Sequence, residues 1–250
     1  FEIENIVKDN VNTIFYAQIN QRKIHPNSEG GFHLSAITVA DIIQFFLNTN
    51  FPEMMEVYKL ENFIMSCKKT VRSLRPKFYL KMCSKPNEAL TFDFSVEDSC
   101  YQGSIEFQKR KTNLKYLSNY NESLLKNSFS IRKANIDRNT INATIDLECL
   151  MSDKTDVGLG IGLILAISSQ ISIIQLYTLS NATSKTNGVV MVGCNIQNKV
   201  VKTSRVLKLK SIAENIRPSR TLKNHLIVDV KIESLDRSFE ANITYVFEPL

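Results

Sequence analysis

Alternation of apolar and polar residues recurs along much of the chain and predicts β-strands. The period of two is most regular at 90–97, 226–233 and 239–247. Successive side chains of a strand point to opposite faces, so this pattern is typical of antiparallel strands with one face in a core and the other in water. Shorter strands are predicted at 13–19, 32–37, 78–82, 104–108, 141–147, 189–193 and 205–209.

Helical periodicity is restricted to a few short stretches. Residues 39–47 are apolar and amphipathic, and 60–72 place Leu60, Phe63, Cys67 and Val71 at helical spacing. Two further helices are predicted at 147–154 and 211–216, and Pro218 would close the second of them. Residues 1–9 are interpreted as the tail of one more helix. Strands therefore outnumber helices, which indicates an α+β protein.

The longest uncharged run lies between Val157 and Ser184 and raises the question of a membrane span. Its length is sufficient, because a spanning helix needs about 20 predominantly apolar residues. Its composition is not, because Ser168, Gln170 and Gln175 lie in its middle and no basic flank or aromatic belt borders it. We therefore expect no membrane anchor.

Three glycines at alternate positions open this run and raise the question of a phosphate-binding loop. Gly158, Gly160 and Gly162 do not match the spacing of a dinucleotide fingerprint, and the Gly-Lys-Ser/Thr of a P-loop is absent. Two buried strands at 162–167 and 171–179, joined by a turn, fit the run better, because β-branched residues dominate both parts. The glycines would form the loop before the first of these strands.

Composition restricts the chemistry. The 250 residues carry a formal net charge of +6, which suits a polyanionic partner without requiring one. The five cysteines are scattered and form no C-x-x-C pair, which argues for a reducing compartment and against a zinc site. The three histidines lie away from any cluster of cysteines or carboxylates in the sequence. No catalytic residue, metal site or cofactor is therefore predicted.

The order of predicted elements resembles a DNA sliding clamp, whose subunit repeats one domain of strands and helices. Three passages carry the resemblance: "GGFHLSAITVADIIQFF" at 30–46, "LENFIMSCKKTVRSLRPKFYLKM" at 60–82 with the strand that follows it, and 205–250 with its terminal "YVFEPL". The pattern is most similar to the Hus-one/Mec-three type subunit of the nine-one-one (9-1-1) checkpoint clamp. The basic charge departs from the replicative clamp, which is usually acidic.

The resemblance implies a PCNA-like fold of two repeated domains, with helices lining the inner face of a ring. The N-terminal domain would span 1–110, with its first strand before Phe1, the linker 111–127 and the C-terminal domain 128–250. The chain would be a non-catalytic subunit of a nuclear heterotrimer with Rad-nine and Rad-one type partners, placed by a clamp loader on double-stranded DNA. The alternative is a replicative or viral polymerase processivity factor. An enzyme with an unrecognised site is a third possibility.

A sliding ring needs positive charge that meets phosphates without reading bases. The expected DNA-binding residues are Lys68, Lys69, Arg72, Lys154, Arg217, Arg220 and Lys223. Exposed edge strands would close the ring by pairing with neighbouring subunits. The expected edges are the strands at 104–108 and 189–193.

Overall fold

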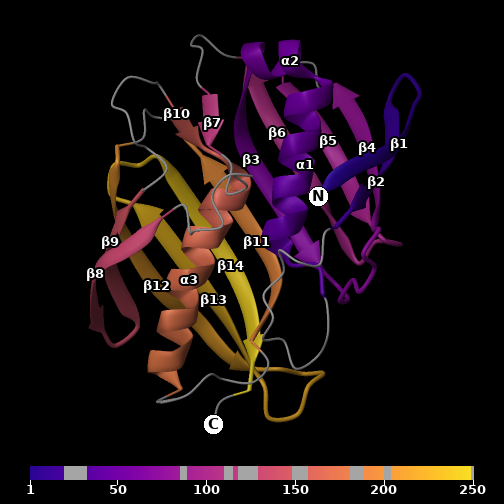
Figure 1. Ribbon diagram of the computed structural model, residues 1–250. Helices are drawn as coiled ribbons and strands as arrows, with labels where there is room; N and C mark the ends of the chain where they lie inside the picture. The colour runs from indigo at the N-terminus through magenta and orange to yellow at the C-terminus, as the bar shows by residue number, and fades with distance from the viewer. Residues whose placement is uncertain are drawn as a thin grey trace.

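The computed structural model shows one sheet running through the molecule, with two long helices packed against one of its faces (Figure 1). The described residues are 1–19, 33–84, 89–109, 115–117, 129–147, 157–180, 189–199 and 204–248.

The two halves of the chain contribute the same order of main elements. The first contains β1 (Glu2–Lys8), β2 (Asn12–Gln18), α1 (Ala36–Asn50), α2 (Pro52–Val57), β3 (Tyr58–Cys67), β4 (Lys77–Ser84), β5 (Ala89–Val96) and β6 (Tyr101–Lys109). The second contains β8 (Ser130–Asp137), β9 (Thr140–Asp146), β10 (Val157–Leu159), α3 (Ile161–Leu179), β11 (Val190–Asn198), β12 (Val206–Pro218), β13 (Leu226–Ser234) and β14 (Phe239–Phe247). Between them, β7 (Lys115–Leu117) pairs in parallel with β10.

The large sheet is a repeat of one six-stranded arrangement. Its 12 strands have the order β1-β2-β4-β5-β6-β3-β11-β14-β13-β12-β9-β8, and neighbouring strands are antiparallel. When the order is read inward from either end, each strand of the first half has an equivalent at the same place in the second half. The halves join at β3 and β11, where Ile64 pairs with Asn195. The predicted domain limits at 110 and 128 stay a prediction, because both residues lie outside the described ranges.

The helix α1 follows from its local sequence. The Oγ of Ser35 accepts a hydrogen bond from the Thr38 N–H at 3.1 Å and so caps the first turn. Val39, Ile42, Ile43 and Phe46 are fully buried on the face that meets the sheet. The Phe46 ring stacks on Phe15 of β2 with centroids 4.0 Å apart. The helix predicted at 39–47 is confirmed.

The uncharged run is one 19-residue helix, so the prediction of two strands was wrong. α3 is buried on several sides, and a helix of this kind has no amphipathic period that would identify it. Its polar residues Ser168, Ser172 and Gln175 recur at helical spacing, and the Ser172 hydroxyl donates to the Ser168 carbonyl at 2.8 Å. α3 is long and apolar enough to cross a membrane, but 72% of its apolar window is buried inside the protein, as expected for a core helix.

Other predicted helices are strands. Residues 60–72 were predicted as a helix, but β3 covers most of them, with Phe63 and Met65 buried and Ile64 exposed between them. Residues 211–216 lie in β12, and residues 1–9 contain β1. β3 and β12 each lie between two strands, whose pairing overrides a weak helical spacing, and β1 at the edge pairs with β2 alone. Of the helix predicted at 147–154, Leu147 is not helical and the rest lies outside the described residues.

The expected edges and the strand predicted at 32–37 were also wrong. The segment 104–108 lies in β6, between β5 and β3, and 189–193 leads into β11, between β3 and β14. The edges of the sheet are β1 and β8 instead. Ile37 lies in α1. Both long helices are packed in the core, so the described residues offer no helix-lined inner face of a ring.

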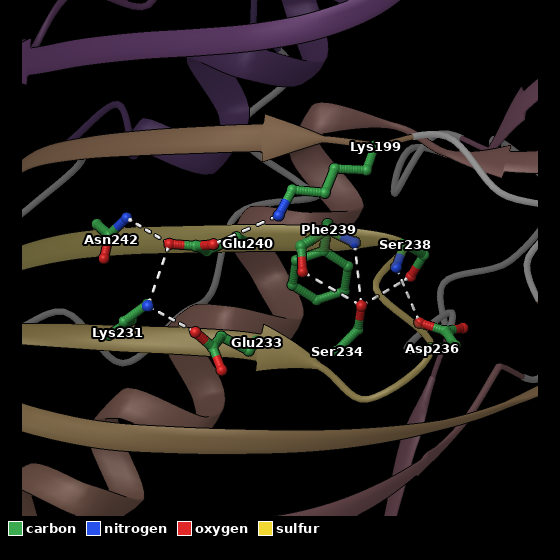
Figure 2. A network of polar contacts seen from close by, with 9 residues as sticks. All are labelled: Lys199, Lys231, Glu233, Ser234, Asp236, Ser238, Phe239, Glu240 and Asn242. Atoms are coloured by element: carbon green, nitrogen blue, oxygen red, sulfur yellow. Dashed lines mark hydrogen bonds and ion pairs between the residues drawn. The ribbon is translucent and has the colours of Figure 1, made fainter.

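The face of the sheet away from the helices is polar. On β13 and β14, Lys231 bridges Glu233 at 2.5 Å and Glu240 at 3.4 Å, and Lys199 approaches Glu240 at 3.7 Å (Figure 2). These side chains alternate with the buried Ile232 and others that face the helices. Exposed pairs of this kind contribute little to stability, typically about 0–1 kcal/mol each.

A buried carboxylate joins β8, β9 and the residue before β12 at one end of the second half. Asp146 of β9 accepts hydrogen bonds from Arg132 of β8 and from the Arg205 Nε, the latter at 3.2 Å. The hydrogen bonds from Arg132 lower the pKa of Asp146 below its ordinary value, and those from Arg205 add to the effect. The ionised form is therefore favoured by folding.

We expect that the stabilising effect of Asp146 depends on pH. Because its pKa is lower in the folded chain, the carboxylate stabilises the fold above the ordinary pKa of about 4 and loses this effect as the pH falls through the folded value. The difference in free energy of unfolding between the wild type and Asp146→Asn should therefore shrink from pH 6 to pH 3 in urea titrations. A difference that stays constant with pH would contradict the assignment.

We expect that Gly103→Ala strongly destabilises the chain, because Gly103 of β6 lies against the backbone of β3. A Cβ on Gly103 would come within 1.9 Å of the Ile64 carbonyl oxygen. Overpacking of this kind costs about 1–3 kcal/mol. Gly193→Ala is the matched control, because its Cβ would lie 3.4 Å from the Met65 carbonyl oxygen. Equal midpoints of urea unfolding for the two variants would contradict this expectation.

Candidate functional site

Two polar side chains on the buried face of α1 lie at the N-terminus of α3. Asp41 and Gln44 are only 5% and 6% exposed. The Gln44 Oε1 accepts a hydrogen bond from the Ile161 N–H at 2.8 Å. Asp41 lies so close to α3 that a Cβ on Gly162 would be 1.8 Å from its Oδ1. A carboxylate and an amide from one half therefore meet the first turn of the helix from the other half.

The sequence before α3 leaves its N-terminus open to such contacts. The N-cap residue is Gly160, which has no side chain to bond the first N–H groups. These groups have no partner within the helix, and the helix dipole places partial positive charge there. Asn198 of β11 donates from its Nδ2 to the Leu159 carbonyl at 3.1 Å and holds the preceding residues. Gly162 has no Cβ, which leaves room for Asp41.

A small apolar cavity lies beside this meeting point. Its volume is about 10 Å³, room for about one water molecule. It lies among α1, α2, β3, β6 and the start of α3. Its lining residues are Gln44, Leu47, Asn48, Met55, Leu60, Phe107 and Ile161.

The corresponding place in the second half has no carboxylate. Counted from the N-caps Ser35 and Gly160, the residues that correspond to Asp41 and Gln44 are Ala166 and Ser169. The N-terminus of α1 is capped by its own Ser35. Of the two related places, only the one at α3 therefore combines a carboxylate with an uncapped helix N-terminus.

The described residues show no metal centre. No group of three or more His, Cys, Asp or Glu side chains among them is arranged to hold an ion. His33 is exposed, and the His225 ring contacts the Lys223 carbonyl at 2.8 Å in the turn after β12. Neither lines the cavity.

Comparison with solved structures identifies the architecture. The chain resembles a conserved protein with a hot dog fold from Alicyclobacillus acidocaldarius, with a TM-score of 0.58 and 8% identity over 97% of this chain and 94% of that one. The chain has the hot-dog fold. Its two halves correspond to two copies, each a sheet that curves around one helix.

Two further structures with this architecture are enzymes by name. The 12:0-ACP thioesterase from Umbellularia californica matches with a TM-score of 0.54 and 9% identity over 94% of this chain and 93% of that one. The dehydratase domain of RzxB from Pseudomonas fluorescens matches with a TM-score of 0.52 and 9% identity over 98% and 97%. No family model matches the chain, and no curated protein matches it in sequence. At these identities the hot-dog likeness concerns the fold alone.

The hot-dog architecture overturns the resemblance to a DNA clamp. The predictions that rested on the clamp were wrong. They are the PCNA-like ring, its heterotrimeric partners, the clamp loader, DNA as partner, and the checkpoint or polymerase role. The prediction that the chain is not an enzyme rested on missing catalytic motifs as well as on the clamp, and it is contradicted too, because several similar structures are named as thioesterases. Nuclear localisation stays an untested prediction.

The predicted basic residues do not lie at the candidate site. Lys68, Lys69 and Arg72 follow β3, at its end away from Leu60 and the cavity. Arg217, Arg220 and Lys223 lie around the turn after β12, at the same end of the sheet, and the Arg217 Nη1 pairs with Asp229 at 2.8 Å. Lys154 lies outside the described residues. Their binding role stays untested, and without the clamp it has no structural basis.

The residues that form the site were missed from the sequence. The available signal was Asp41 and Gln44, two polar residues on one face of an otherwise apolar helix. Buried polar side chains of this kind need partners, and their partner is the N-terminus of a helix more than a hundred residues away.

We expect that Gly162→Ala destabilises the chain, because its Cβ would overlap Asp41. The cost should be about 1–3 kcal/mol, as for other overpacked sites. In an Asp41→Ala background the same change should cost clearly less, because the side chain that it overlaps is gone. Urea unfolding of the four chains of this double-mutant cycle provides the measurement. Additive effects of the two substitutions would show that Gly162 and Asp41 do not meet.

Proposed function

We propose that this chain is an enzyme that hydrolyses acyl thioesters at the meeting point of α1 and α3. The observation that carries the proposal is the buried carboxylate of Asp41 against the uncapped N-terminus of α3. The names of similar structures, several of them thioesterases, support this chemistry.

Thioester hydrolysis requires two things that this arrangement can supply. A base must take a proton from the attacking water, and Asp41 is the carboxylate in place. The carbonyl oxygen gains negative charge as water adds, and the dipole of α3 and the first-turn N–H groups that follow Ile161 stabilise that charge. When the C–S bond breaks, Asp41 returns the proton to the sulfur that leaves.

Gln44 and Asn198 would act as positioning residues. Gln44 fixes the Ile161 N–H, and Asn198 fixes the Leu159 carbonyl. Together they hold the backbone on either side of Gly160. The N–H groups are therefore oriented before a substrate arrives, and this is the condition under which they stabilise charge most effectively.

The RzxB domain is named as a dehydratase. Dehydration fits the described site of this chain less well than hydrolysis. Removing water from an acyl group needs a base for one proton and an acid for the departing hydroxyl. Among the described residues, the titratable group at the site is Asp41, which lies against Gly162, while Gln44 and Asn48 of the cavity lining are amides. Hydrolysis needs only one such group.

We expect that Asp41→Asn abolishes most of the hydrolysis. The substitution preserves the shape of the side chain and removes the base, so the rate should fall by about 10²–10⁴-fold. The measurement is thiol release from acyl-N-acetylcysteamine thioesters by the purified chain. Asp137→Asn is the control, because Asp137 is an exposed carboxylate at the end of β8. If both variants hydrolyse the thioesters as the wild type does, or the wild type hydrolyses none, the proposal is wrong.

A further inference from the structure

The strands β6 and β14 occupy equivalent positions in the two halves but carry different aromatic residues beside the helix. This difference affects which ligand the cavity can receive. In β3 the register shifts between Leu60 and Asn62, and in β11 it shifts at the matching place, between Met191 and Gly193. Just before the shift, Leu60 pairs with Phe107 and Met191 pairs with Tyr245. Phe107 in the first half therefore corresponds to Tyr245 in the second.

In the second half, Tyr245 fills the space between the sheet and α3. Its hydroxyl lies 3.4 Å from the Oγ of Ser169, the residue that corresponds to Gln44. The side chain is only 2% exposed, and burial raises its pKa to about 12. A phenolic hydroxyl and a serine thus occupy the space between sheet and helix.

The first half leaves this space partly empty. Phe107 lacks the hydroxyl, and Gln44 turns its Oε1 to Ile161 of the other half. What remains is the cavity of about 10 Å³ beside the proposed reaction site. The surface that it exposes is apolar, so it suits a hydrocarbon group better than water.

One wall of this cavity is adjustable. Met55 comes from α2, a helix of only six residues, and is partly buried. A methionine side chain has three rotatable bonds and changes shape at low cost. If its tip swings away, it frees the volume of about three heavy atoms next to the cavity. The other walls, among them Leu60 and Phe107, belong to the sheet and are fixed by strand pairing.

We propose that this cavity receives the acyl group of the substrate, and that Phe107 and Met55 restrict it to short chains. This inference rests on the proposed hydrolysis. Ligand pockets for larger molecules have volumes of about 300–1,000 Å³. A cavity for one water molecule plus the space vacated by Met55 holds an acyl group of about two to four carbons. A long chain such as a 12-carbon acyl group does not fit without displacing α2 or the sheet.

The test compares acyl-N-acetylcysteamine thioesters from acetyl to dodecanoyl in four chains. The wild type should have its highest kcat/KM at four carbons or fewer and lose at least tenfold by eight carbons. Met55→Ala should move this limit upward by about three carbons, because it removes the tip of the side chain. Phe107→Tyr should lower kcat/KM for butyryl at least tenfold, because it copies the filled second half.

Tyr245→Phe is the matched control, because it removes a hydroxyl from the corresponding position in the other half. Its chain-length profile should equal that of the wild type. Thermal unfolding identifies any variant that fails to fold, and Met55→Ala and Phe107→Tyr test the cavity from different walls. The inference is overturned if the wild type hydrolyses dodecanoyl as fast as butyryl, or if the profile of Met55→Ala coincides with that of the wild type.

A binding experiment separates this inference from the proposed function. Saturation-transfer NMR would be recorded with butyl and dodecyl thioether analogues, which cannot be hydrolysed. If no thioester is hydrolysed but butyl binds and dodecyl does not, the cavity is a short-chain site and only the hydrolysis is wrong. If neither analogue binds, or if dodecyl binds as well as butyl, the inference is overturned.

Discussion

The hydrogen bond from the Ile161 N–H to Gln44 joins the two halves of the chain at the start of α3. A helix begins with N–H groups that have no partner within it, and Gly160 offers no side chain to bond them. Because the start of α3 is buried, protein groups rather than solvent must satisfy these donors. Gln44 of α1 satisfies one of them, the Ile161 N–H, and this bond fixes where the two helices meet. The strands that follow, β3 and β11, then lie side by side and make one sheet of the two halves.

The same constraint makes the two halves unequal. Both have a helix in a curved sheet, but only α3 begins without a cap of its own. Of the two helix N-termini, α1 and α3, only that of α3 therefore meets a carboxylate and an amide of the described residues. In the second half the corresponding space is taken by Tyr245 and Ser169. Repetition of the fold thus yields one candidate site rather than two.

The polar residues of α3 illustrate how the second half is stabilised without a site. Gln175 donates to the Asn139 carbonyl and accepts a hydrogen bond from Ser211 of β12. The Ser172 hydroxyl donates within the helix. These bonds tie the buried helix to the strands around it, and satisfied polar groups in a core favour one specific packing.

Strand positions were largely determined by the sequence itself. The alternation at 226–233 and 239–247 is a local pattern, and it predicted β13 and β14. It did so because one face of an antiparallel sheet is buried and the other is exposed to water. Residues 39–47 likewise predicted α1 through the period of one apolar face. In these segments the pattern and the final environment agree.

The tertiary structure decided what these elements do to one another. α3 could not be recognised as a helix, because burial on several sides removes the amphipathic period. Residues 60–67 of the predicted helix at 60–72 lie in β3, because two neighbouring strands impose alternation on them. The site depends on Asp41 and Gln44 meeting Gly162 and Ile161, and that contact exists only once the two halves have folded together. Local sequence determines the period of an element, but contacts between residues far apart in the chain depend on the packing of the whole.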